Sequence, residues 1–200
     1  MPIRKPAEDR KAEIIAALLV LADRIGPDRL TTNDVARAVG VTQAAIFRHF
    51  PTKAALWSET GEVIAGRLAE AWQRAIAEGA TPATRLRGLV DAQLRQIEAA
   101  PALPAILHSR ELNVDNAALR DRFRGLLAQY QSLLTANLSE MIRAGAIRPG
   151  IAPADAAVLL TSLVQGMAIR WSLGARNFSL IGEGKRLLDV QLRLLAAKED

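Results

Sequence analysis

One short segment, residues 30–56, concentrates the side chains whose types and spacing could do chemistry. It reads LTTNDVARAVGVTQAAIFRHFPTKAAL and predicts two short helices, about Thr31–Val39 and Gln43–His49. Gly40 can adopt the left-handed backbone conformation that ends the first helix, and Thr42 can cap the second. The second helix is too short and too polar at one end to exist for core packing alone. This pattern indicates a helix-turn-helix that reads double-stranded DNA.

The predicted recognition helix offers side chains that could read base edges in a major groove. Gln43 carries a donor and an acceptor that suit adenine, and Ala44 could touch the methyl group of thymine. Phe47 could make an apolar contact with a base or a sugar. Arg48 could bind guanine or a phosphate, although an arginine taken alone is equally typical of a solvated surface.

Other side chains around this helix could hold phosphates. The hydroxyls of Thr31 and Thr32 lie at a helix N-terminus, which attracts anions. Lys53, in the first turn of the next helix, opposes the helix dipole unless a negative group such as a phosphate lies beside it. His49 could donate to a phosphate or could be an ordinary surface residue between helices. The full set predicted to contact DNA is Thr31, Thr32, Thr42, Gln43, Ala44, Phe47, Arg48, His49 and Lys53.

Together, these residues resemble the DNA-binding segment of the TetR repressor family. The matching elements are Thr32, Val35-Ala36, Gly40-Val41-Thr42, Phe47-Arg48-His49-Phe50 and Pro51-Thr52-Lys53-Ala54-Ala55-Leu56. Phe47 stands where the family usually has a tyrosine whose hydroxyl meets a phosphate, so Phe47 ranks below Thr32, His49 and Lys53 as a phosphate contact. The resemblance covers about a quarter of the chain.

The resemblance implies a homodimer that binds a palindromic operator. It also implies a regulatory domain in which a small-molecule effector shifts the spacing of the two recognition helices. We therefore expect a transcription regulator, and specifically a repressor released by an effector that the sequence does not identify. The alternative is an architectural or protein-interaction module that binds DNA without a small-molecule effector.

The elements around this segment are predicted to be helical throughout. Hydrophobic residues make up 50% of the chain and aromatic residues 4%, and the helix formers Ala and Leu dominate. We expect an all-α fold with a three-helix DNA-binding domain at residues 1–56 and a helical regulatory and dimerisation bundle at residues 57–200. The nine predicted helices span about 8–25, 31–39, 43–49, 53–78, 84–99, 104–107, 116–144, 153–173 and 181–197.

The predicted helix at residues 153–173 is apolar nearly all round, so it must be covered on every side. In a chain of this length its own bundle covers one face. The same surface of a second copy would cover the other, as in two-fold dimers. The alternative is a central helix of a monomeric bundle.

Positive charge is concentrated at the front of the chain. The net charge is +5, and the first 56 residues hold nine Lys or Arg against six Asp or Glu, a net of +3. The basic residues Arg4, Lys5, Arg10 and Lys11 could follow the DNA backbone or reach into a minor groove, or could belong to a solvated terminus. We expect a cytoplasmic protein, because the N-terminus lacks an apolar signal core and no run of about 18 uninterrupted apolar residues occurs.

Polar and aromatic residues within the apolar helices are the candidates for lining an effector cavity, although each could equally be a satisfied core residue. Because Leu, Ala and Met dominate around them, we expect an apolar effector. The candidates are Trp72, His108, Phe123, Tyr130, Gln165, Arg170 and Trp171.

The sequence does not favour an enzyme. It contains two histidines and no cysteine, and it lacks HExxH and GxSxG motifs. The stretch Gly182-Glu183-Gly184-Lys185 resembles a phosphate loop only faintly, because neither the preceding strand nor the full spacing is present. We expect no cofactor and no metal site.

Overall fold

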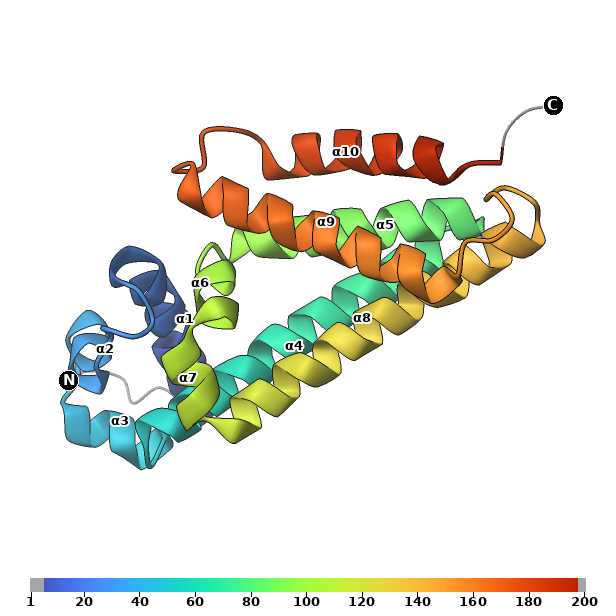
Figure 1. Cartoon of the computed structure of the whole chain (residues 1–200). Coiled ribbons are helices and arrows are strands. Elements are labelled where there is room, and N and C mark those ends of the chain that lie inside the picture. The colour runs from blue at the N-terminus through green and yellow to red at the C-terminus, as the bar shows by residue number, and fades with distance from the viewer. Residues whose placement is uncertain (1–5, 198–200) are drawn as a thin grey trace. The chain divides into compact units, whose positions relative to one another are not determined.

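The computed structural model describes residues 6–197 and confirms the predicted all-α class. Within this range it contains ten helices and no strand, apart from one isolated bridge between Ile147 and Ala196 (Figure 1). The helices are α1 Ala7–Ile25, α2 Thr32–Ala38, α3 Gln43–His49, α4 Lys53–Glu78, α5 Pro82–Ala99, α6 Leu103–His108, α7 Arg110–Asp115, α8 Ala117–Arg143, α9 Pro153–Leu173 and α10 Leu180–Leu195.

The described residues contain one helix more than the nine predicted, and the addition is α7. Its N-cap is Ser109, whose hydroxyl accepts a hydrogen bond from the Leu112 amide at 3.0 Å. Glu111 lies in the first turn, where an acidic residue favours the helix dipole. A serine followed by an acidic residue is typical of the start of a helix, so this signal was present in the sequence. Six residues are too few, however, to show the helical repeat of apolar positions.

The contacts divide the described chain into two compact units. One comprises residues 6–64 and 100–123, and the other comprises residues 65–99 and 124–197. Each unit is therefore discontinuous in sequence, and both α4 and α8 contribute to the two units. The functional boundary after residue 56 stays a prediction.

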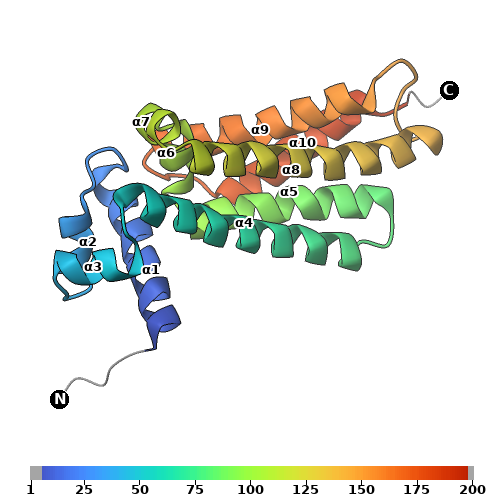
Figure 2. The ribbon, with the colours of Figure 1, turned by 90° about the horizontal axis from the view of Figure 1, so that it is seen from below.

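In the first unit, α2 and α3 pack on α1 around a small apolar core (Figure 2). Most of the larger apolar side chains of the helix-turn-helix are buried, whereas Val39 and Val41 are half-buried. This core fixes the angle between the two short helices. Its fully buried members are Ile14, Leu18, Val35, Ala36, Ile46 and Phe50.

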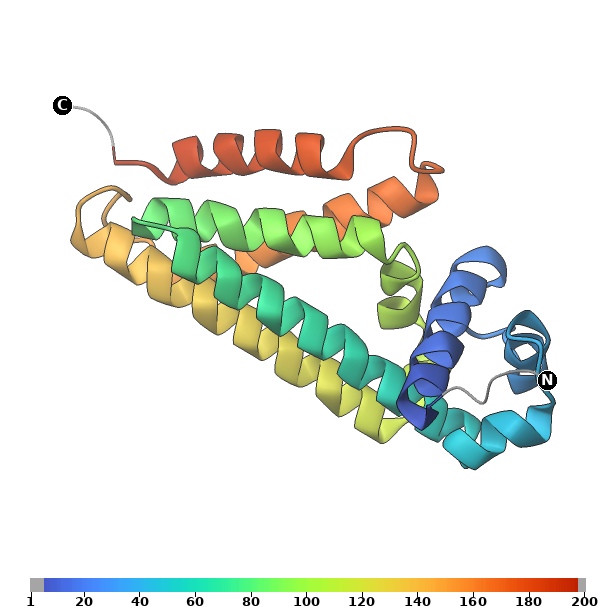
Figure 3. The ribbon, with the colours of Figure 1, turned by 180° about the vertical axis from the view of Figure 1, so that it is seen from behind.

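In the second unit, α10 packs against both α5 and α9 (Figure 3). The approach of α10 to α5 is close enough that a Cβ at Gly184 would collide with the side chain of Leu94. Among the described helices, α9 is long and apolar enough to cross a membrane by length and composition alone. One face of α9 is nevertheless buried in this unit, as in the core helix of a globular domain, through Ala156, Ala157, Leu160, Val164, Met167, Ala168 and Trp171.

Candidate DNA-binding site

The recognition helix α3 presents one polar face to solvent and buries the other. Thr42 caps the helix by accepting a hydrogen bond from the Ala45 amide at 3.2 Å, and Gly40 has the predicted left-handed φ of +69°. Ile46 is fully buried on the inner face. The outer face carries four exposed residues of the predicted set, which are Gln43, Ala44, Phe47 and Arg48.

Thr31 forms a capping box with Asp34 at the start of α2. Its hydroxyl accepts from the Asp34 amide at 3.2 Å and donates to Asp34 Oδ2 at 2.6 Å. The hydrogen bonds from the side chain and backbone of Thr31, followed by that from Arg37, hold the pKa of the Asp34 carboxyl below its usual range. The hydroxyl of Thr31 is therefore already engaged within α2.

Thr32 lies beside it but is buried, with 7% of its surface exposed. Its Oγ1 accepts a hydrogen bond from Gln43 Nε2 at 2.7 Å. The structure thus joins a residue predicted to hold phosphate to a residue predicted to read a base. The positions of Thr32 and Gln43 in the sequence did not predict this hydrogen bond.

Two cations border the recognition face without a partner of their own in the part of the chain that the structure describes. Arg48 is exposed on α3. Lys53 is half-buried at the start of α4, and the first turn of that helix contains no acidic residue. Thr52 caps α4, because its hydroxyl accepts a hydrogen bond from the Ala55 amide at 3.0 Å. The half-buried His49 has its ring 6.5 Å from that of Phe50.

The predicted basic N-terminal residues are only partly available to DNA. Arg10 pairs with Glu13 at 2.8 Å, and Lys11 lies 3.7 Å from a carboxylate oxygen of Glu59 and 5.9 Å from the centre of the Phe50 ring. Arg4 and Lys5 lie outside the described residues.

A buried polar connection that sequence reasoning missed supports the beginning of α4. Asn116 is 7% exposed, and its Nδ2 donates to the carbonyl of Ala54 at 2.9 Å. Its Oδ1 accepts from Ser58 Oγ and from the Leu119 amide, both at 3.1 Å, so Asn116 also caps α8. An asparagine before a helix signals a cap, but its partners more than fifty residues away follow only from the tertiary structure.

The residues predicted to contact an effector differ in burial. Trp72 and Tyr130 are both buried, and their ring centres lie 5.2 Å apart. Trp72 Nε1 donates to Gln93 Oε1 at 3.0 Å, whereas the Tyr130 hydroxyl is buried without a partner in the described structure. Phe123 and Trp171 are also buried, and the remaining candidates, His108, Gln165 and Arg170, are exposed.

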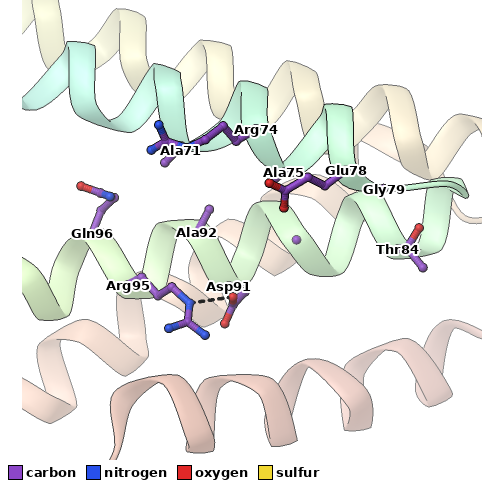
Figure 4. Close-up of a pocket in the computed structure, with 11 residues that line it drawn as sticks. Ala71, Arg74, Ala75, Glu78, Gly79, Thr84, Asp91, Ala92, Arg95 and Gln96 are labelled. Atoms are coloured by element: carbon purple, nitrogen blue, oxygen red, sulfur yellow. Dashed lines mark hydrogen bonds and ion pairs between the residues drawn. The ribbon is translucent and has the colours of Figure 1, made fainter.

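A groove of about 390 Å³ lies between α4 and α5 (Figure 4). Small residues such as Ala75 and Gly88 line it, and none of the predicted effector residues does so. Arg95 and Lys185 each lie 2.8 Å from a carboxylate oxygen of Asp91. Burial would raise the pKa of Asp91, but the hydrogen bonds from Lys185 and Arg95 outweigh it and lower the pKa.

Two short helices joined by a glycine turn, with an exposed polar face bordered by unpaired cations, define a helix-turn-helix DNA-binding regulator. The chain belongs to the TetR family of bacterial regulatory proteins. The model of that family's DNA-binding region matches residues 14–60, and the model of the C-terminal region of BetI-type transcriptional repressors matches residues 82–196.

Relatives and solved structures agree with this assignment. The nucleoid occlusion factor SlmA of Vibrio cholerae serotype O1 is 32% identical over 158 residues, which cover 78% of this chain and 79% of that protein. The ketosteroid transcriptional regulator KstR2 of Mycobacterium tuberculosis has the same fold, with a TM-score of 0.78, 19% identity and coverage of 94% and 96%. FadR of Bacillus subtilis, solved in complex with stearoyl-CoA, gives a TM-score of 0.76 at 19% identity, with coverage of 90% and 97%.

Proposed function

We propose that this regulator binds a palindromic operator as a homodimer in the cytoplasm and represses transcription until a small-molecule effector releases it. The observation that carries the proposal is the exposed face of α3, on which Gln43, Ala44 and Phe47 lie together above the buried Ile46. Base edges in a major groove match this combination of an amide, a methyl group and an aromatic ring.

The outer face of α9 supports a dimer. Val158 and Leu159 are each 49% exposed and Leu173 is 83% exposed, so this apolar face is uncovered in one copy. A Cβ at Gly166, between them, would meet nothing within 4 Å, so a second helix can approach closely there. A second copy of the same face would bury these residues and place two recognition helices on two half-sites.

The direct test of operator recognition is in-vitro selection of random duplex DNA by the full-length protein at near-physiological salt. Recovery of an inverted repeat, bound much more weakly by the Gln43→Ala variant, would support the proposal. Weak binding with no recovered motif, for the protein alone and with candidate effectors present, would contradict it.

Replacement of Lys53 by Ala should weaken binding to every duplex sequence. One phosphate contact fewer should lower the slope of log affinity against log salt by about one unit. Titrations at several salt concentrations measure that slope, and Lys185→Ala in α10 is the matched control that should leave it unchanged. A loss confined to one operator base pair would instead assign Lys53 to base reading.

The buried pair of Trp72 and Tyr130 is the best-supported contact for an effector among the predicted residues. Burial raises the pKa of Tyr130, so the phenol is neutral and its hydroxyl remains a donor with no acceptor in the described structure. An effector with an apolar body and an acceptor oxygen would satisfy it. A thermal-shift panel that includes stearoyl-CoA and polar metabolites tests this, and stabilisation by charged polar metabolites alone would contradict an apolar effector.

Tyr130→Phe should raise the free energy of unfolding by about 1 kcal/mol, because it removes a buried polar group that lacks a hydrogen bond. Trp72→Phe is the contrasting variant, since it deprives Gln93 of its donor and should lower stability. Chemical denaturation measures both. Destabilisation by Tyr130→Phe would mean that the hydroxyl already has a partner, and an effector would then need another contact.

A second candidate function is DNA binding that no small molecule controls. The SlmA relatives favour it, because they are named nucleoid occlusion factors and match this chain over 71–80% of their length at 27–32% identity. Operator titrations with each compound that stabilises the protein separate the two functions. Loss of operator affinity supports the effector-controlled repressor, whereas unchanged affinity with every such compound supports the architectural or protein-interaction role.

A further inference from the structure

Thr32 and Gln43 are eleven positions apart in sequence and are joined by one side-chain hydrogen bond within the helix-turn-helix. Gln43 Nε2 donates to Thr32 Oγ1 at 2.7 Å. Thr32 is buried, whereas Gln43 is exposed at the start of α3. A buried hydroxyl is poorly placed to reach a phosphate but well placed to hold an exposed amide by a hydrogen bond.

The orientation matters because the two ends of a glutamine amide make opposite kinds of hydrogen bond. The nitrogen has two donors and the oxygen only accepts. With one N–H of Gln43 donated to Thr32, as the structure shows, the amide oxygen and the second N–H remain available for a base. Adenine presents a donor at N6 beside an acceptor at N7 in the major groove, whereas guanine presents acceptors at both O6 and N7. The held amide therefore matches adenine and opposes guanine.

The neighbouring hydroxyl cannot substitute for that of Thr32. Thr31 donates to Asp34 Oδ2 at 2.6 Å and accepts from the Asp34 amide, so its hydroxyl is engaged in capping α2. The two adjacent threonines thus have separate tasks: Thr31 caps a helix, and Thr32 contacts the recognition side chain.

We infer that Thr32 is a positioning residue for base specificity, which makes Gln43 select adenine over guanine by engaging one N–H of its amide. This inference rests on the proposed recognition of an operator by α3. It gives Thr32 a role that requires no contact with phosphate, in place of the phosphate contact expected from the sequence.

The test uses the full-length protein and four duplexes that differ only at the base pair whose preference Gln43→Ala abolishes. Thr32→Val should lower the ratio of adenine to guanine affinity by about tenfold, since a good side-chain pair with a base is worth about 1–3 kcal/mol. Its affinity for unrelated DNA and its salt slope should not change. Thr32→Ser keeps the hydroxyl and should keep the ratio, and Thr32→Ala, which lacks the β-branch, should lose it as Thr32→Val does.

Two controls separate positioning from stability. Thr52→Val removes the cap of α4 and should lower the melting temperature without changing the affinity ratio. In a Gln43→Ala background, Thr32→Val should have no further effect on the ratio, because the side chain that it positions is absent.

The inference is overturned if Thr32→Val weakens binding to all four duplexes equally, which would indicate a phosphate contact. It is also overturned if the unmodified protein prefers guanine at the position that Gln43 reads. If the unmodified protein shows no base preference anywhere, the proposed operator recognition itself fails, and that result is distinct from a uniform loss caused by Thr32→Val.

Discussion

Val158→Asp should convert the protein to a monomer and lower its affinity for the full palindromic operator by about two to four orders of magnitude. Val158 is 49% exposed on the outer face of α9, so the change adds a charge to the proposed interface without disturbing a packed side chain. A charge in an apolar two-fold contact is repeated in both copies and must be desolvated twice. In the dimer, binding of one subunit to its half-site holds the other subunit near the second half-site, so the second contact forms easily. A monomer loses this advantage.

Sedimentation measures the oligomeric state of this variant, and titration against a full operator and an isolated half-site measures its binding. The loss of affinity should appear with the full operator and be nearly absent with the half-site. Val114→Asp is the matched control, because Val114 is 63% exposed on α7, outside the proposed interface. If the Val158→Asp variant remains dimeric, the dimer interface does not lie on this face of α9.

Asn116→Ala should lower the free energy of unfolding by about 3 kcal/mol. Removal of the side chain leaves the Ala54 carbonyl and the Ser58 hydroxyl without this partner and also removes the cap of α8. Both hydrogen bonds are part-buried, so each loss costs about 1 kcal/mol, and loss of the helix cap costs about 1 kcal/mol more. Because Ala54 follows Lys53, we also expect weaker operator binding at temperatures where the variant is folded.

Guanidinium denaturation gives the free energy of unfolding, and Asn113→Ala is the matched control. Asn113 donates to the carbonyls of Leu107 and Ser109 near the surface, where water can replace the lost side chain. Its removal should cost no more than about 1 kcal/mol. If the two variants lose equal stability, the connection from Asn116 to α4 is not the source of the difference.

The fold class and most helix limits were predictable because they depend on local signals. Lys53–Glu78 and Pro153–Leu173 begin at residues marked by Thr52 and by proline, and they end near glycines. The capping threonines and Gly40 were predictable for the same reason, since each acts on backbone groups within a few residues. The missed helix, α7, is so short that its capping serine and the acidic residue of its first turn were the only local signals.

The exposed face of α3 was predictable as a set of residues but not as a set of contacts. The alternation of buried and exposed positions in α3 follows from the helical period, so Gln43 and Arg48 could be placed on the outer face. The period does not show that Gln43 would be held by a residue of α2, because that bond depends on the angle between two packed helices. The same limit applied to the effector candidates. The helical pattern could not separate the buried Trp72 from the exposed Gln165.

By itself, then, the sequence determined the all-helical fold, the limits of its longer helices and the identity of the DNA-reading segment. These follow from propensity, capping and period, which act over a few residues. The tertiary structure decided that Thr32 holds Gln43, that Asn116 anchors the start of α4, and that the outer face of α9 is left uncovered. Each of these depends on which distant side chains packing brings together, and that information is not contained in the local spacing of residues.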